Sequence, residues 1–332
     1  MPDTLPVPEL SYPFPTVVSP FETDESFHDE REWYETYYGF LPEGDRAKYK
    51  EHDLAQGAAY MSPTVTDPAR LRPMARWFVF LTQIDDYHEF HTVPELVAVR
   101  DRVRDILSGE EPHDGEPGHL RFLARMRAEF QEFMPHLWLE RLAHSFHEFF
   151  TYGVMEEAPY KLGKRSGPPS LAHYLLIHEY SIAMRPYGDL VEPAMGGVLP
   201  ESVFRHPVIQ RLRSLICRLM SVQNDLHSLA KEEARPSECV NIVPVLCHEL
   251  GCTRDEAVAE AVRILDSFSA EILALGRQLP DFGPYQEGVR EYFRQMQLMV
   301  TGLERWYRYS RSTRYRIPGA FPDVAPEARR RP

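Results

Sequence analysis

From Glu30 onward, apolar residues recur at a spacing near 3.6 in almost every segment, and good helix formers occupy the positions between them. Short stretches rich in proline and glycine, such as GEEPHDGEPG and GKRSGPP, separate these periodic segments. No alternating pattern of apolar and polar residues is long enough to build a sheet, and we find no internal repeat. The sequence therefore predicts an all-α fold.

Helix starts and connection lengths favour one domain. Asp67 before Pro68 is typical of an N-cap followed by proline at the first helical position, and Thr253 with Glu256 forms a capping box. Because no connection exceeds ordinary loop length, we expect one domain over residues 26–332. Residues 1–25 are rich in proline and lack a period, so they predict an irregular N-terminal arm that either drapes over the body or stays mobile.

Charge and cysteine content limit the classes of partner. The formal net charge is -13, and a field of this sign repels phosphates, which argues against a nucleic-acid-binding or membrane-binding protein. The four cysteines show no C-x-x-C spacing, so neither a zinc site nor a disulfide framework is predicted. The opening stretch lacks the basic and apolar regions of a signal peptide, and no uncharged apolar run could span a bilayer. We therefore expect a cytoplasmic protein.

The segment RWFVFLTQIDDYHEFH, residues 76–91, predicts a helix with an acidic cluster on one face. On such a helix Glu89 projects about 40° from Asp85, and Asp86 projects about 100° from it, so the three carboxylates share a face. Toward the N-terminus the same stripe continues through apolar side chains, namely Leu81, Phe78 and Met74. An apolar wall that ends in clustered negative charge is costly to bury unless cations neutralise the charge.

A second predicted helix, residues 207–233, contains the stretch NDLHSLAKE. Asn224, Ser228 and Glu232 lie four residues apart and form a ladder of oxygen-bearing side chains opposite an apolar stripe. A carbonyl, a hydroxyl and a carboxylate suit a hard divalent cation, and Mg²⁺ is the natural candidate. Magnesium commonly takes further ligands from water and from a phosphate-bearing substrate, so an acidic protein could hold a diphosphate through bridging ions.

A third element lies near the C-terminus in RYSRSTRYRIP, where Arg314 and Tyr315 offer a guanidinium fork and a phenol to phosphate oxygens. Taken singly, each pattern has an ordinary explanation. An isolated DDYHE is most often a solvated helix face, and the oxygen ladder could be exposed surface with i,i+4 contacts. Together the patterns predict two helices that face each other across a cavity and share a metal cluster.

These three motifs resemble those of class I terpene synthases of the bacterial type, and the resemblance covers most of the chain. DDYHE at 85–89 resembles the aspartate-rich motif, NDLHSLAKE at 224–232 resembles the second metal motif, and RY at 314–315 resembles the C-terminal Arg-Tyr pair. The resemblance implies a helical bundle with a central active-site cavity. The mouth of this cavity would bind three Mg²⁺ ions and a diphosphate.

The resemblance also implies roles for the matching positions. The candidate metal ligands are Asp85, Asp86, Glu89, Asn224, Ser228 and Glu232. Asp85 would hold two ions and the oxygen ladder would hold the third, whereas Asp86 and Glu89 would either bind metal or orient and neutralise their neighbours. The candidate diphosphate ligands are Arg314, Tyr315 and Lys231.

The sequence departs from the family at one position. Such enzymes usually place an arginine that senses the diphosphate upstream of the second metal motif, and this chain has His178 there. Arg185 precedes Pro186, which should disrupt the helix and could let the arginine reach inward. We rank Arg185 ahead of His178 as the substitute, while a packed or surface histidine remains the plain alternative. If neither residue serves, diphosphate triggering is altered, slow or absent.

Phe78 and Trp306 are the aromatic residues predicted to face the cavity. Phe78 shares the stripe of Asp85, and Trp306 precedes the Arg-Tyr pair, although the tryptophan of the family usually stands closer to that pair. Aromatic faces can stabilise a desolvated carbocation through their quadrupoles. Core packing explains both residues equally well.

These features predict a lyase that ionises a linear isoprenyl diphosphate and cyclises the resulting carbocation. The fifteen-carbon farnesyl compound is the favoured substrate. Two alternatives stay open: a non-catalytic isoprenoid-binding helical protein that has lost triggering, and a prenyltransferase, which the asparagine and serine of the second motif disfavour. The sequence is also compatible with a homodimer.

Overall fold

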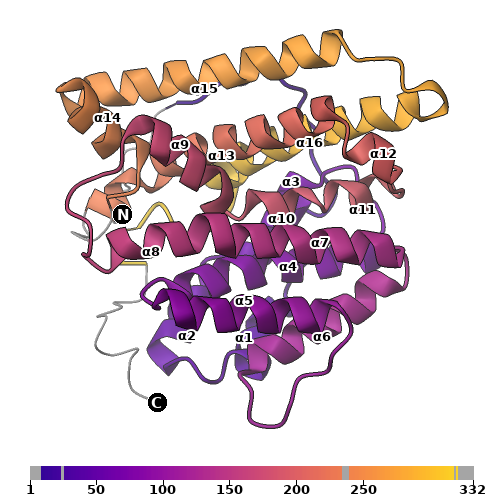
Figure 1. Ribbon diagram of the computed structural model, residues 1–332. Coiled ribbons are helices and arrows are strands. Elements are labelled where there is room, and N and C mark those ends of the chain that lie inside the picture. Colours follow the sequence, from indigo (N-terminus) through magenta and orange to yellow (C-terminus); the bar gives the residue numbers. More distant parts are fainter. Residues whose placement is uncertain (1–8, 24–25, 234–238, 318, 321–332) are drawn as a thin grey trace.

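In the computed structural model, which describes residues 9–23, 26–233, 239–317 and 319–320, all regular elements are helices (Figure 1). The absence of strands in this part of the chain confirms the predicted all-α class. In chain order the elements are α1 Glu30–Tyr37, α2 Glu43–Lys50, α3 Leu54–Met61, α4 Pro68–His88, α5 Val93–Leu107, α6 Gly118–Gln131, α7 His136–Glu148, the π-helix η1 Phe149–Val154, α8 Met155–Lys161, α9 Leu171–Ser181, α10 Met184–Gly188, α11 Val191–Met195, α12 Glu201–Phe204, α13 Pro207–Glu233, α14 Ile242–Leu250, α15 Arg254–Arg277, the 3-10 helix η2 Gly283–Tyr285 and α16 Gln286–Tyr309. None of the described helices has the length and apolarity needed to cross a bilayer.

The helix starts follow the predicted capping chemistry. The side chain of Asp67 accepts a hydrogen bond from the amide of Ala69 at 2.9 Å, and proline follows at the first position of α4. At α15, the amide of Thr253 donates to Glu256 Oε2 at 2.9 Å, and the amide of Glu256 donates to Thr253 Oγ1 at 3.4 Å. Both caps satisfy amides that have no partner inside the helix.

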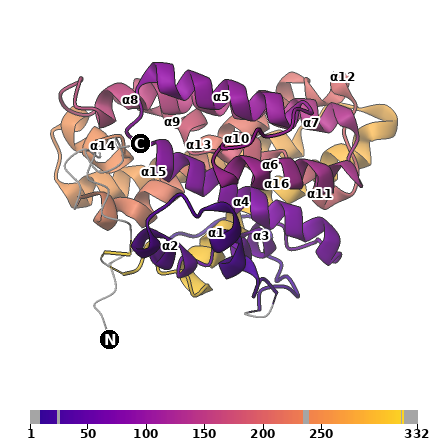
Figure 2. The ribbon, with the colours of Figure 1, turned by 90° about the horizontal axis from the view of Figure 1, so that it is seen from below.

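The long helices surround the centre of the bundle. α13 packs against α9, α15 and α16, and α3 packs against both α4 and α16. α15 lies at one edge of the bundle, as Figure 1 shows. Figure 2, viewed from below, shows α1, α2, α5 and α6 on the near side, opposite to α15. The two helices predicted to carry metal ligands, α4 and α13, are therefore both interior elements.

Two glycines allow the interior helices α3, α4 and α16 to approach one another closely. A Cβ at Gly302 of α16 would overlap the carbonyl oxygen of Tyr60 in α3. A Cβ at Gly57 of α3 would overlap the ring of Phe78 in α4. Interiors are packed too densely to absorb such overlaps, so these two glycines set how near α3 lies to its neighbours.

A continuous helical rod is formed by α7, η1 and α8, which follow one another without a break. Its π-helical turn carries Gly153, where a Cβ would overlap the backbone of Tyr180 and Ser181 at the end of α9. Beyond that contact Ala183 adopts a left-handed backbone with φ 60°, and α10 then begins at Met184. The contact places the π-helical turn that leads into α8 beside the break between α9 and α10.

The described part of the N-terminal arm, residues 9–23, lies against α16. Phe14 is buried, and Thr301 Oγ1 donates to the carbonyl of Pro15 at 2.8 Å. Arg305 forms an ion pair with Glu22 at 2.7 Å. Of the two states predicted for the arm, residues 9–23 adopt the draped one, whereas residues 1–8 and 24–25 lie outside the described part of the chain.

Glu30 is a buried carboxylate that caps a helix from a distance. It accepts hydrogen bonds from the amides of Leu54 at 3.2 Å and Ala55 at 3.1 Å, at the N-terminus of α3. Burial, helped by the negative charge of Asp53, raises its pKa from 4.5 to about 8. The carboxyl group is therefore held largely in its neutral form at pH 7.

The substitution Gly302→Ala should lower the free energy of unfolding by about 2 kcal/mol or more, because the added methyl group forces α16 away from α3. Chemical denaturation followed by circular dichroism measures this loss. Gly44→Ala is the matched control, since no atom lies within 4 Å of a Cβ at that position and alanine favours the helix. Equal stabilities for the two variants would contradict the close approach of α16 and α3.

The substitution Glu30→Gln should change how stability depends on pH. The folded-state pKa of Glu30 lies above its unfolded value, so the stabilising contribution is complete below about pH 4.5 and is lost as the pH rises through 8. The stability of the wild type should thus fall relative to Glu30→Gln between pH 5 and 8.5. Urea denaturation across this range, with the exposed Glu32→Gln as control, would refute the burial effect if the difference did not vary with pH.

Candidate active site

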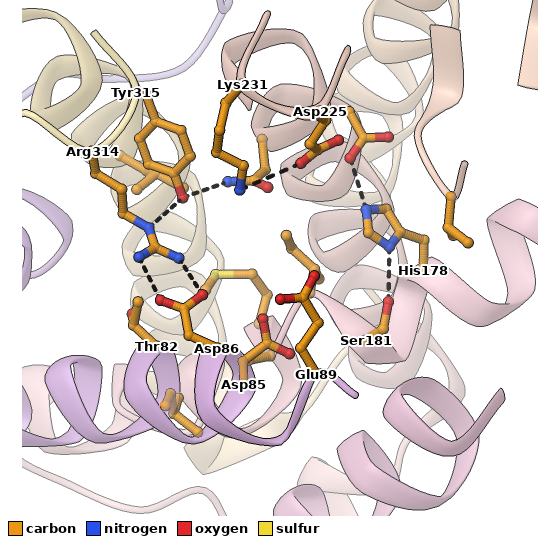
Figure 3. Close-up of a pocket in the computed structure, with 18 of the residues that line it drawn as sticks. Thr82, Asp85, Asp86, Glu89, His178, Ser181, Asp225, Lys231, Arg314 and Tyr315 are labelled. Carbon is orange, nitrogen blue, oxygen red and sulfur yellow. Dashed lines mark hydrogen bonds and ion pairs between the residues drawn. The ribbon is translucent and has the colours of Figure 1, made fainter. Parts of the chain in front are cut away.

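The bundle contains a central cavity of about 130 Å³, lined by α4, α8, α9, α13, α16 and the segment after α16 (Figure 3). The predicted site residues that line it are Phe78, Asp85, Asp86, Glu89, His178, Asn224, Lys231, Glu232, Trp306, Arg314 and Tyr315. Ser228 and Arg185 are not among the lining residues. The structure thus brings together nearly all of the side chains that the three motifs predicted.

The acidic cluster of α4 contains two aspartates in different states. Arg314 reaches Asp86 through two hydrogen bonds, Nη1 to Oδ2 at 2.7 Å and Nη2 to Oδ1 at 2.8 Å (Figure 3). Burial opposes the charge of Asp86, but the guanidinium outweighs it and holds the pKa of Asp86 well below its ordinary value. Burial raises the pKa of Asp85 to about 6, although Lys161 acts in the opposite direction. Among the described residues, none forms a hydrogen bond or ion pair with Asp85, so its charge is not neutralised by a direct contact.

The oxygen ladder of α13 is only partly presented to the cavity. Asn224 Nδ2 donates to the hydroxyls of Tyr307 at 2.7 Å and Tyr315 at 3.2 Å, so the carboxamide oxygen is the atom that can bind a cation. Glu232 Oε2 accepts from Asn241 at 2.8 Å. Ser228 is fully buried, and its hydroxyl donates to the carbonyl of Asp225 at 3.4 Å. Two of the three predicted ligands of this ladder therefore face the cavity, and Ser228 lies behind its wall.

A buried ionic cluster joins α8, α9 and α13 at the side of the cavity. His178 Nε2 lies 2.8 Å from Asp225 Oδ1, and His178 Nδ1 lies 2.8 Å from Ser181 Oγ and 3.1 Å from Glu157 Oε1. Burial opposes the charge on His178, but Asp225 and Glu157 outweigh it and raise its pKa to about 10. His178 is therefore an imidazolium whose ring nitrogens both face protein acceptors, as Figure 3 shows for Asp225 and Ser181.

Arg185 does not reach inward, which corrects the expectation built on Pro186. The helix breaks earlier, at the left-handed Ala183, and Glu179 then pairs with Arg185 at 2.7 Å. A further carboxylate, Glu148, lies 3.8 Å away. Of the two residues considered for the missing arginine, only His178 lines the cavity. The residue that we ranked second therefore lies at the cavity, and the residue that we ranked first lies away from it.

Aromatic rings form the base of the cavity. The rings of Phe78 and Trp306 meet edge to face with centroids 5.8 Å apart, and Phe78 contacts Tyr187 in the same manner at 5.3 Å. Trp306 Nε1 donates to the carbonyl of Asp53 at 3.3 Å, which fixes the orientation of its ring. Both predicted aromatic residues therefore lie in the cavity wall, where their faces and edges are held rigidly.

The donor set of the cavity fits a hard divalent cation better than a soft one, because it consists of carboxylate and carboxamide oxygens. Within the part of the chain that the structure describes, no group of three or more His, Cys, Asp or Glu side chains is arranged to hold a metal ion by itself. Asp85 and Glu232 nevertheless face the same cavity from α4 and α13. An ion between these helices would complete its coordination with Asn224, water or a ligand.

A family model described as "Terpene synthase family 2, C-terminal metal binding" matches residues 76–270, which is more than half of the chain. The chain belongs to this terpene synthase family. The matched range contains both the acidic cluster of α4 and the oxygen ladder of α13. The terpene synthase is therefore a lyase of class I type that acts on an isoprenyl diphosphate and binds divalent metal, as the sequence predicted.

Curated relatives agree with this assignment, and a solved structure shares the fold. The terpene synthase is 26% identical over 271 residues to the (+)-eremophilene synthase of Sorangium cellulosum (strain So ce56), covering 80% of each chain. It is 25% identical over 273 residues to the (2E,6E)-farnesyl diphosphate cyclizing 7-epi-alpha-eudesmol synthase of Streptomyces viridochromogenes, covering 78% of each chain. The linalool/nerolidol synthase from Streptomyces clavuligerus superimposes with a TM-score of 0.77 at 22% identity, covering 90% of this chain and all of that one.

Sequence reasoning missed several polar residues of the terpene synthase site. Asp225 could have been identified from the sequence, because it follows Asn224 within the second motif. On a helix it projects about 100° from Asn224, toward the buried side of α13. It accepts hydrogen bonds from the hydroxyl of Tyr174 at 2.7 Å and the amide of Ile242 at 2.6 Å, in addition to its contact with His178. Glu157 and Lys161 of α8 line the cavity without any motif to mark them.

The substitution Asp225→Asn should lower the pKa of His178 and destabilise the enzyme. The amide removes the charge that favours the imidazolium and cannot satisfy the donors of Tyr174 and Ile242 equally well, which should cost about 2 kcal/mol of unfolding free energy. A pH titration of histidine signals by NMR, together with urea denaturation, measures both effects. The exposed Asp255→Asn is the control. An unchanged titration of His178 would show that Asp225 does not govern its charge.

Proposed function

We propose that the cavity binds three Mg²⁺ ions and converts farnesyl diphosphate into a cyclic sesquiterpene with release of diphosphate. The supporting observation is that the α4 carboxylates and two members of the α13 oxygen ladder, Asn224 and Glu232, line one cavity whose base is aromatic. The curated 7-epi-alpha-eudesmol synthase, which is named as a farnesyl diphosphate cyclising enzyme, supports the choice of a fifteen-carbon substrate.

The proposed metal ligands are distributed over the two helices. Asp85 would bind two ions, because it lines the cavity, is half-buried and has no ion-pair partner among the described residues. Asn224, Ser228 and Glu232 would bind the third ion, which requires the hydroxyl of Ser228 to turn away from Asp225. When bound, the ions would supply positive charge that stabilises the departing diphosphate. Asp86 and Glu89 would act beside them, and the pairing of Asp86 with Arg314 favours a neutralising role for Asp86.

Basic and phenolic groups at the cavity would bind the diphosphate directly. Arg314 can donate two hydrogen bonds to phosphate oxygens if it exchanges Asp86 for the ligand, and Tyr315 lies beside it, since Arg314 Nε donates to the Tyr315 hydroxyl at 3.2 Å. Lys231 lines the same cavity from α13 and lies over the ring of Tyr315 at 5.8 Å. These donors would stabilise the negative charge that develops as the carbon–oxygen bond breaks.

The aromatic base would then shield the carbocation. Phe78 and Trp306 present π-systems to the cavity, and each could stabilise a passing cation by about 2 kcal/mol when water is excluded. A cavity of 130 Å³ is smaller than the roughly 300 Å³ or more that is typical of ligand pockets. Lining side chains must therefore move when the substrate binds. A flexible residue such as Met184 is suited to this movement.

A substrate panel tests the proposal. Wild-type enzyme is incubated with MgCl2 and C10, C15 or C20 isoprenyl diphosphates, and products and released diphosphate are measured. We expect a cyclic C15 product that depends on Mg²⁺. Asn224→Ala should lower kcat/KM by about 100-fold or more, equivalent to about 2.7 kcal/mol of transition-state stabilisation. Gln210→Ala, on the same helix but outside the cavity, should leave the rate near that of the wild type.

The remaining outcomes of the panel distinguish the other functions. Tight binding of a diphosphate without turnover would identify a non-catalytic isoprenoid-binding protein, and an elongated product would identify a prenyltransferase. Arg185→Ala should retain turnover, because Arg185 pairs with Glu179 away from the cavity. A large loss of turnover in this variant, at unchanged melting temperature, would restore the role first predicted for Arg185.

A further inference from the structure

On the side of the cavity formed by α8 and α9, the positive charge of His178 is already paired with other side chains of the protein. His178 is the lining residue at the position of the missing arginine. Its Nε2 faces Asp225, and its Nδ1 faces Ser181 and Glu157. An imidazolium has only two N–H donors, so this histidine cannot donate to a diphosphate without releasing one of these acceptors.

A second cation stands on the same side. Lys161 is the last residue of α8 and lines the cavity, with 15% of its side chain exposed. Its ammonium lies 3.4 Å from Glu157 Oε2, one helical turn earlier. Glu157 is thus shared, because its other carboxylate oxygen receives hydrogen bonds from His178 and Ser181. The cluster of Lys161, His178, Glu157 and Asp225 balances two positive and two negative charges.

Lys161 shares the cavity with the acidic cluster on α4. Asp85 lines this cavity from α4, and Lys161 lines it from α8. A diphosphate held by metal ions at Asp85 would therefore occupy the cavity that the ammonium of Lys161 lines. Its oxygens carry negative charge and would accept hydrogen bonds from this ammonium.

The side chain of Lys161 is suited to contact both Glu157 and a diphosphate. The ammonium is a compact charge on a flexible stem with three donors, so it can keep Glu157 and still donate to a phosphate oxygen. The helix that ends in Lys161 is fixed near its start, because Gly153 packs closely against the backbone of Ser181. The other basic groups that line the cavity, Lys231 and Arg314, come from α13 and from the segment after α16.

We propose that Lys161 binds the diphosphate of the substrate from the α8 side of the cavity, on the side where His178 replaces the usual arginine. This proposal rests on the proposed function of the cavity. Lys161 touches the leaving group, whereas Glu157 positions the ammonium beside the cluster of His178 and Ser181. His178 in turn keeps Glu157 ionised, since it and Lys161 outweigh the effect of burial and lower the pKa of Glu157.

The test compares Lys161→Gln, which removes the charge and shortens the side chain by one atom, with Lys164→Gln, the same change at an exposed lysine three residues later that does not line the cavity. Isothermal titration with inorganic diphosphate in MgCl2 gives the dissociation constant for each variant. We expect Lys161→Gln to weaken binding by about tenfold or more, the effect of one charge-assisted hydrogen bond, and to lower kcat/KM for farnesyl diphosphate. Lys161→Arg, which retains the charge, should keep most of the affinity.

The proposal is overturned if Lys161→Gln binds diphosphate as tightly as Lys164→Gln. It is also overturned if Lys161→Arg loses as much affinity as Lys161→Gln, which would indicate a structural role for the side chain. Melting temperatures verify that the variants are folded. If Lys161→Gln unfolds below the assay temperature, the affinity of Lys161→Arg for diphosphate is compared with that of the wild type, and a large loss overturns the proposal. Failure of the wild type to bind or turn over any isoprenyl diphosphate would instead refute the proposed function itself.

Discussion

A carboxylate buried beside a cavity must be paired with a cation, hydrogen-bonded or protonated, and this constraint organises the centre of the terpene synthase. Asp86 is paired with Arg314, and Asp225 is paired with His178. Asp85 is half-buried in the same region without such a partner among the described residues, and desolvation raises its pKa to about 6. The three aspartates thus differ in what they can still bind. Of these three aspartates, only Asp85 has no cationic side chain in direct contact among the described residues.

The paired carboxylates also connect elements that are distant in sequence. Asp225 accepts donors from α9 and from the first amide of α14, so one side chain of α13 holds both helices at the cavity. Asn241, at the start of α14, donates to Glu232 and to the carbonyl of Asp225, which orients the last residue of the oxygen ladder. Arg314 ties the segment after α16 to α4 in the same way. The ion pairs that neutralise the site are therefore also the contacts that assemble it.

The fold class and most of the site could be predicted from the sequence, because helical periodicity is a local property and the motifs lie on single helices. The interval from Asn224 to Glu232 fixes which side chains share a face of α13, whatever packs against it. Capping at Asp67 and Thr253 is likewise local, and the structure confirms it. The expected inward reach of Arg185 is not observed, because it depended on where the chain turns after α9. That turn occurs at Ala183, before the proline.

The sequence by itself determined the helical periods, the caps and the three groups of residues that we propose to bind metal and phosphate, since each group lies on one helix or one short segment. Only the tertiary structure decided which charges neutralise one another. Lys161 and Glu157 belong to no recognisable motif, and they reach the cavity because a π-helical turn at Gly153 seats their helix against the end of α9. Ion pairing depends on distances between separate helices, and such distances are set by packing over the whole core rather than by local spacing.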